Sequence, residues 1–189
     1  MGLSILYMAV PSKFARTVRN DKGLTDVFIT IFGYGSGIDN FFTEIEQDEI
    51  DEITEGLLKD DISRLKDLIN ETKFGSKAYI NKTFDIHASG LKEYFNKNGT
   101  SEPEHMANLI VGGDEYKLGE SILGFDASDV ENISELLSGN FSEILSCYSF
   151  DGPHSDKAWK EVITNELQRL IECYESANKI KGEVWIGFL

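Results

Sequence analysis

Apolar residues recur along the chain in runs and stripes that predict strands alternating with helices. An apolar run over residues 3–10 stops at Pro11 and predicts a buried strand, and residues 12–18 predict a helix after it. A second run, Val27–Phe32, fits either a strand or one face of a helix, and we favour the helix. The chain therefore opens with a strand that is followed by helices.

The C-terminal part carries the clearest pattern. Apolar spacing predicts a helix between Asp126, as its N-cap, and Gly139, at its exit, and a long helix over residues 156–178. The final segment Glu183–Phe188 has apolar residues on both alternating faces, which predicts a strand inside a sheet rather than at its edge. Shorter patterns predict one more helix over 83–95 and one more strand over 120–125.

Strands separated by helices indicate an α/β domain, with α+β as the alternative, in which helices cover both faces of a central mixed sheet. A length of 189 residues without a repeat or a linker predicts a single domain over 1–189. Between Ile38 and Ile69 the apolar spacing predicts two amphipathic helices with a break near residues 59–61.

The polar side of these two predicted helices is strongly acidic, which bears on the kind of partner that the protein could bind. The whole chain has 18 Lys and Arg against 33 Asp and Glu, a net charge of −15, and residues 39–61 contain ten acidic residues and one lysine. Such a charge repels nucleic acid and anionic lipid and attracts a basic protein. A solvated surface is the simpler interpretation. The residues that we expect to form a partner-binding acidic face are Glu44, Glu46, Asp48, Glu49, Asp51, Glu52, Glu55, Asp60 and Asp61.

Candidate catalytic residues are few. His87 lies two residues after Asp85 and beside an apolar stripe, which allows an acid–base pair, although a buried histidine more often satisfies a local hydrogen bond. His105 and His154 flank loops and are expected to be exposed. The glycines of residues 33–37 do not fit the dinucleotide-binding spacing. We expect no metal and no cofactor.

Cellular location is predicted from what the sequence lacks. No apolar run is long enough to cross a membrane or to serve as a signal segment. Cys147 and Cys173 are far apart and stand in apolar surroundings, which is typical of reduced packing residues rather than of a disulfide. We expect a cytoplasmic protein that binds no membrane.

Several segments resemble, in their order and spacing, the YfbM-like family of bacterial proteins, a domain of unknown function. After Met1-Gly2, the segments that carry the resemblance are Lys82–Asp85, Asn108–Gly113, Ser121–Ile133 and the last helix with Val184–Phe188. Residues 38–72 look like an insertion or a diverged section. The resemblance implies a single cytoplasmic α/β domain and no settled activity. The family typically has Lys-x-Trp with a histidine four residues after the tryptophan, whereas this chain has Phe84 and Ala88 there.

Two functions remain open from the sequence. The first is a non-enzymatic acidic binding protein, an immunity or inhibitor protein that neutralises a basic antibacterial toxin such as a nuclease. The alternative is a YfbM-like housekeeping protein that acts as an enzyme or small-molecule binder. It would use a pocket near Tyr7, Phe84, Asp85, His87 and Tyr116.

Overall fold

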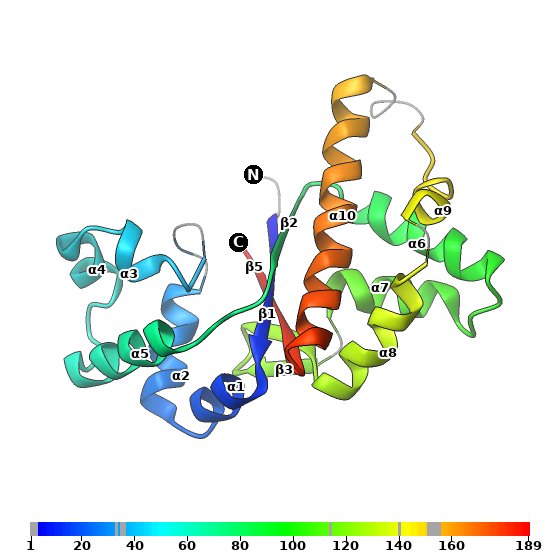
Figure 1. The fold of residues 1–189 in the computed structure, drawn as a ribbon. Helices are drawn as coiled ribbons and strands as arrows, with labels where there is room; N and C mark the ends of the chain where they lie inside the picture. Colours follow the sequence, from blue (N-terminus) through cyan, green and yellow to red (C-terminus); the bar gives the residue numbers. More distant parts are fainter. Residues whose placement is uncertain (1–3, 33, 35–36, 114, 140, 151–155) are drawn as a thin grey trace.

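A five-stranded antiparallel sheet lies at the centre of the fold. The computed structural model describes residues 4–32, 34, 37–113, 115–139, 141–150 and 156–189. The strands are β1 Ser4–Pro11, β2 Lys77–Asn81, β3 Glu115–Leu118, β4 Ile122–Phe125 and β5 Gly182–Phe188. Their order is β2-β1-β5-β4-β3, and helices lie on both faces of the sheet (Figure 1). The predicted single domain is therefore confirmed, in its α+β form.

The strands β1 and β5 form the middle of the sheet and are apolar on both faces. Side chains alternate along a strand, so Ile5 and Tyr7 point to one face of β1 while Leu6 and Met8 point to the other. β5 pairs with β1 on one side and with β4 on the other, which confirms the prediction of an interior strand. Two separate apolar cores result, one on each face.

The first core lies beneath five helices from the second half of the chain. The long helix α10 packs across β2, β1 and β5, and α8 packs against α10. Two buried tyrosines fasten the end of α7 to this core, because Tyr7 and Tyr174 donate hydrogen bonds to the carbonyls of Val111 and Ile110. These helices are α6 Phe84–Lys97, α7 Pro103–Gly112, α8 Ala127–Leu137, α9 Phe141–Leu145 and α10 Lys157–Lys179.

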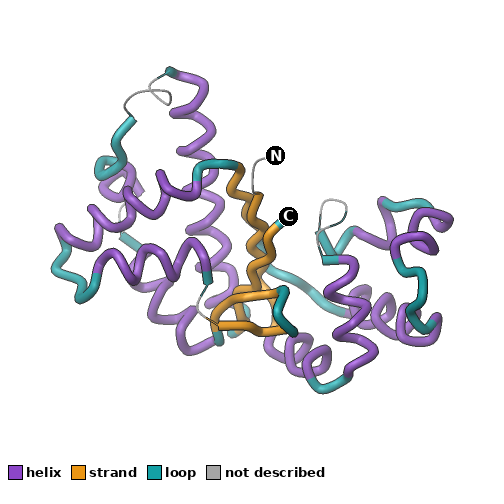
Figure 2. Tube along the Cα trace, turned by 180° about the vertical axis from the view of Figure 1, so that it is seen from behind, coloured by secondary structure: helices purple, strands orange, loops and turns teal. Residues whose placement is uncertain are grey.

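The second core lies beneath five helices from the first half of the chain. Trp185 of β5 is fully buried there and meets Phe28 edge to face, with the ring centroids 5.1 Å apart. Seen from behind, the strands separate the two groups of helices (Figure 2). The helices of this second group are α1 Ser12–Arg19, α2 Lys22–Ile31, α3 Phe41–Glu44, α4 Gln47–Ile53 and α5 Lys59–Glu71.

Three local features differ from the expectations. The sheet is antiparallel throughout rather than mixed, because the long helical connections between strands do not force a parallel crossover. The acidic segment holds three helices, and the break before α5 lies at residues 54–58, where Gly56 adopts a left-handed φ of 83°. Asp60 and Asp61 lie in the first turn of α5, where the helix dipole favours carboxylates, so they mark a helix start.

Several smaller expectations can also be compared with the structure. The helix favoured for Val27–Phe32 is confirmed by α2. Cys173 is buried, Cys147 is half-buried, and both thiols are free, as expected. Asp126 stands at the N-cap of α8 but makes no capping hydrogen bond, and its carboxylate instead lies 3.0 Å from the Lys117 ammonium.

Gly124 should be the glycine of the sheet least able to accept a side chain. An added Cβ would lie 2.0 Å from the carbonyl oxygen of Val184, whereas at Gly112 the nearest heavy atom is 3.7 Å away. Overpacking predicts that Gly124→Ala lowers the free energy of unfolding by about 1–3 kcal/mol. Urea denaturation should show this loss and a near-neutral effect for Gly112→Ala. Equal effects of the two substitutions would contradict the strand packing described here.

Candidate functional site

The acidic face lies at the outer edge of the second helix group. Glu44 ends α3, four of the carboxylates belong to α4, and Glu55 follows α4 in the turn before α5. In α4, Ile50 is buried and Ile53 packs partly buried against the second core, whereas the other side chains of this helix are exposed. In Figure 1, α3 and α4 lie far from the helices of the first core. The structure thus brings the predicted partner-binding residues to one protruding region.

Some members of the acidic face have structural partners. Asp61 lies 2.9 Å from Arg64, which also pairs with Asp21 at the N-cap of α2, so Asp61 helps to join α5 to α2. Asp51 accepts a hydrogen bond of 2.8 Å from Gln47 one turn earlier. Contacts within the fold therefore account for two of the nine carboxylates, Asp51 and Asp61.

Six members of the acidic face are exposed and make no ion pair or side-chain hydrogen bond with any described residue. Asp48 and Glu49 lie in the first turn of α4, where the helix dipole stabilises them, but Glu52 lies near its C-terminus, where the dipole opposes a negative charge. The fold therefore does not account for all of this charge. The six residues are Glu46, Asp48, Glu49, Glu52, Glu55 and Asp60.

The histidine that the sequence singled out belongs to a buried polar cluster between α6 and α10. His87 is fully buried, with its Nε2 3.2 Å from Glu166 Oε2 and its Nδ1 3.2 Å from the Tyr148 hydroxyl. Glu166 also accepts hydrogen bonds from the Thr83 hydroxyl and, at 2.9 Å, from the backbone N–H of Asn81. Both ring nitrogens of His87 are thus engaged inside the core.

The protonation of this cluster follows from its partners. A carboxylate only accepts hydrogen bonds, so His87 donates from Nε2 to Glu166, while its Nδ1 shares a hydrogen bond with the Tyr148 hydroxyl, a group that both donates and accepts. Burial raises the pKa of Glu166, but the hydrogen bonds from His87, Thr83 and Asn81 outweigh burial, and the resulting pKa lies below its ordinary value. Burial raises the pKa of Tyr148, so its hydroxyl stays neutral.

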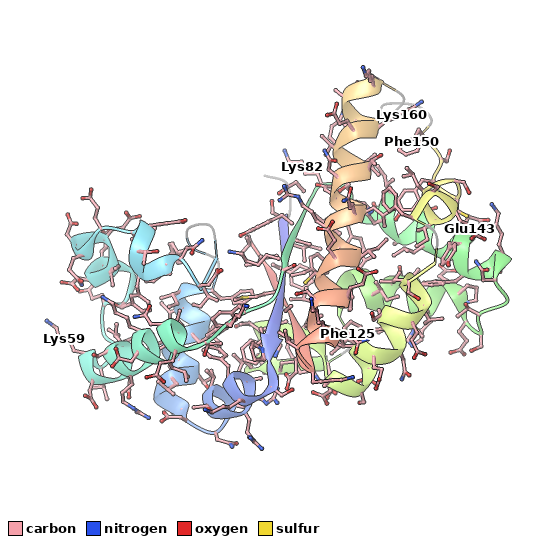
Figure 3. All side chains as sticks on the ribbon, viewed as in Figure 1. Lys59, Lys82, Phe125, Glu143, Phe150 and Lys160 are labelled. Carbon is pink, nitrogen blue, oxygen red and sulfur yellow. The ribbon has the colours of Figure 1, made fainter. Side chains whose placement is uncertain are left out.

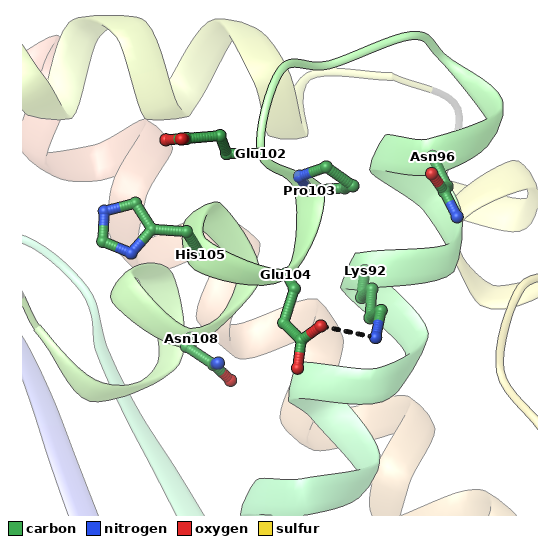
Figure 4. Close-up of a pocket in the computed structure, with 7 residues that line it drawn as sticks. All are labelled: Lys92, Asn96, Glu102, Pro103, Glu104, His105 and Asn108. Carbon is green, nitrogen blue, oxygen red and sulfur yellow. Dashed lines mark hydrogen bonds and ion pairs between the residues drawn. The ribbon is translucent and has the colours of Figure 1, made fainter.

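Asp85 does not join His87, although the two residues are close in sequence. Asp85 is exposed and lines a hollow between α6 and α7 with Lys92 and Glu104. A second, larger hollow of about 730 Å³ shares the same Lys92–Glu104 ion pair, whose atoms are 2.7 Å apart (Figure 4). His105, also in this hollow, is exposed as expected, while His154 and the glycines at 33 and 35 lie outside the described residues.

The other residues of the predicted pocket divide into two places. Tyr7 is fully buried in the first core, and Phe84 packs partly buried against the same core. Tyr116 lies apart from them, 59% exposed on the edge strand β3. The two hollows between α6 and α7 are lined by none of Tyr7, His87 and Tyr116.

Glu166, Thr83 and Tyr148 were missed by the sequence reasoning. A signal existed for Glu166, because it falls on the apolar stripe of α10 between Ile163 and Leu167, where a carboxylate needs a buried partner. Nothing comparable marks Tyr148, which reaches His87 only because the chain after α9 folds back over α6. Near this segment, the Lys160 ammonium lies 5.6 Å from the ring centroid of Phe150, a cation–π contact (Figure 3).

Comparisons with protein-family models, with curated proteins and with solved structures find no match for this chain. Among the described residues, no three side chains of His, Cys, Asp or Glu are grouped so that they could hold a metal ion. In the same residues, the helices are too short or too polar to cross a membrane. The resemblance to the YfbM-like family thus stays a prediction.

The buried cluster predicts a pH-dependent stability. Because the folded pKa of Glu166 is below its ordinary value of 4.5, its contribution is present above about pH 4.5 and is lost as the pH falls through the folded pKa. We expect Glu166→Gln to lower the free energy of unfolding by roughly 1–3 kcal/mol at pH 7 and by clearly less at pH 3.

Urea denaturation at the two pH values measures this difference. The matched control is Glu175→Gln, an exposed position on the same helix, which should change stability by less than about 0.5 kcal/mol at either pH. A destabilisation by Glu166→Gln that is equally large at both pH values would show that the charge of Glu166 does not contribute.

Proposed function

We propose that this protein is a non-enzymatic acidic binding protein that docks a basic protein partner through the acidic face. The observation that carries the proposal is the row of exposed carboxylates on and around α4 that have no partner among the described residues. The partner class that suits such a face is a basic antibacterial toxin, such as a nuclease, for which the protein would be the immunity protein.

The energetics of α4 support a docking role. Like charges crowded on a seven-residue helix repel one another, which opposes folding rather than helping it. The same field attracts a basic protein from a distance and raises its association rate. A phosphate backbone would be repelled by this field, so nucleic acid is not the partner in our proposal.

The state of the predicted acid–base pair also favours binding over catalysis. His87 is buried with both ring nitrogens occupied, and Asp85 is exposed on the other side of the helix start. General acid–base catalysis needs a titrating group within hydrogen-bond reach of a substrate. His87 therefore serves the fold in our proposal, and Asp85 does not form the expected acid–base pair with it.

A small-molecule binder is the second candidate, and the hollow between α6 and α7 favours it. Its volume of about 730 Å³ is in the range of ligand sites, but its lining is largely polar, whereas such sites are mostly apolar. This makes it the weaker of the two functions. We place the protein in the cytoplasm, where its two free thiols would stay reduced.

Charge removal on α4 should slow association with the partner. Affinity capture from the native organism provides the partner, and stopped-flow measurements give the association rate constant. We expect neutralisation of α4 to lower this rate constant about tenfold or more at low salt and to flatten its salt dependence. The substitutions are Asp48→Asn, Glu49→Gln, Asp51→Asn and Glu52→Gln.

A control variant removes the same number of charges from exposed positions on α8, α9 and α10. It should lower the association rate constant only about twofold, because the attraction between two charges weakens with the distance between them. If the two variants associate at the same rate, the acidic face is a solvated surface and the proposal is wrong. The control substitutions are Glu135→Gln, Glu143→Gln, Glu161→Gln and Glu175→Gln.

A further inference from the structure

A groove opens within the acidic region, between α5 and the pair α3 and α4. Its volume is about 300 Å³, and its lining is mixed: the apolar part is Phe42, Ile50 and Ile62, and the polar part is Gln47, Asp51, Lys59, Ser63 and Lys66. Small-molecule sites range from about 300 to 1,000 Å³, so this groove suits one large side chain better than a whole ligand.

The wall formed by Phe42 is held in place by its neighbours. Phe41 is fully buried and meets Phe42 edge to face, with the ring centroids 5.0 Å apart. Ile50 anchors α4 in the second core and forms another part of the groove. Because Phe42 and Ile50 are already held in place, the groove can bind a side chain without reorganising its own residues. This keeps the entropic penalty of binding small.

Two lysines line the groove, although the surrounding segment is acidic. The Lys66 ammonium lies 5.7 Å from the ring centroid of Phe42, a cation–π contact. Lys59 stands at the outer end of α5 and has no ion pair or hydrogen bond with a described residue (Figure 3). Both cations attract the face of an aromatic ring, whereas the Asp51 carboxylate in the same lining attracts a basic residue beside that ring.

We infer that this groove receives an aromatic side chain, tryptophan or tyrosine, from the basic partner, while the surrounding carboxylates hold basic residues next to it. This inference rests on the proposed function, because it takes the occupant from a basic protein. Charge and shape both select the occupant: the apolar part of the lining and the two lysines favour an aromatic ring, and the carboxylates of α4, of which Asp51 lines the groove, favour basic neighbours. The aromatic ring then contributes most of the binding energy of the interface. The carboxylates attract the basic residues beside the ring and raise the association rate.

Two synthetic peptides test the anchor on the full chain. One is acetyl-Lys-Lys-Trp-Lys-Lys-amide, and the other has alanine in place of tryptophan. Titration of the ¹⁵N-labelled protein at low salt should give a dissociation constant about tenfold lower for the tryptophan peptide, a difference of about 1.4 kcal/mol. The amide signals of Ile62, Ser63 and Lys66 should shift only with the tryptophan peptide.

A protein variant with a filled groove separates the groove from the charge. Ser63 is exposed and lines the groove, so the indole of Ser63→Trp should occupy it and abolish the preference for tryptophan. Asn70→Trp is the matched control, because Asn70 lies two turns further along the same face of α5, outside the groove lining. This control should keep the tenfold preference, and thermal denaturation confirms that both variants are folded.

The possible results distinguish the two proposals. Equal dissociation constants of the two peptides for the wild type, or a preference that survives in Ser63→Trp, would overturn the groove inference. In that case the acidic face could still bind the alanine peptide, and the proposed function would stand. If neither peptide binds at low salt, the docking of basic partners is wrong as well.

Discussion

The structure depends on one constraint, the burial of both faces of β1 and β5. Each strand carries large apolar side chains in both directions, so neither face can be left to water, and each needs its own layer of helices. The second half of the chain builds one layer around α10, and the first half builds the other around α2 and α5. β1 comes from the beginning of the chain and β5 from its end, so neither core can be completed before both ends have met.

Carboxylates occur in two different settings in this fold. Glu166 in the first layer is buried and accepts hydrogen bonds from His87, Thr83 and Asn81, so its charge joins α10 to the start of α6. Glu183 in the second layer is likewise buried and accepts hydrogen bonds from Arg19 and Trp185. The carboxylates of α4 instead point outward, and most of them have no side-chain partner among the described residues. This contrast is the basis for assigning a docking role to α4 and a structural role to His87.

The elements found from sequence are those whose pattern carries a strong local signal. The apolar stripe of α10 and the two-sided run of β5 each predict an element with few alternatives. β3 is too short to show a period. The apolar spacing joins α3 and α4 into one predicted helix, and it places a break at residues 59–61, where α5 in fact begins, because acidic residues at a helix start resemble an acidic break. Strand direction depends on contacts across the whole chain, which local spacing does not contain. Likewise, the acidic face was visible as composition, but the partner of His87 was not, since Glu166 lies 79 residues away.

In our proposal, the carboxylates of α4 serve a partner rather than the fold. The most direct test compares the free energy of unfolding, from urea denaturation at low and high salt, of the wild type and the variant in which Asp48, Glu49, Asp51 and Glu52 are neutralised. We predict that the variant is as stable as the wild type or slightly more stable at low salt, and that the difference vanishes at high salt. The repulsion that is removed is expected to match or exceed the lost dipole stabilisation of Asp48 and Glu49, and asparagine at position 51 still accepts the hydrogen bond from Gln47. If neutralisation lowers the free energy of unfolding by about 1 kcal/mol or more, these carboxylates stabilise the fold, and this result would contradict the proposed docking role of α4.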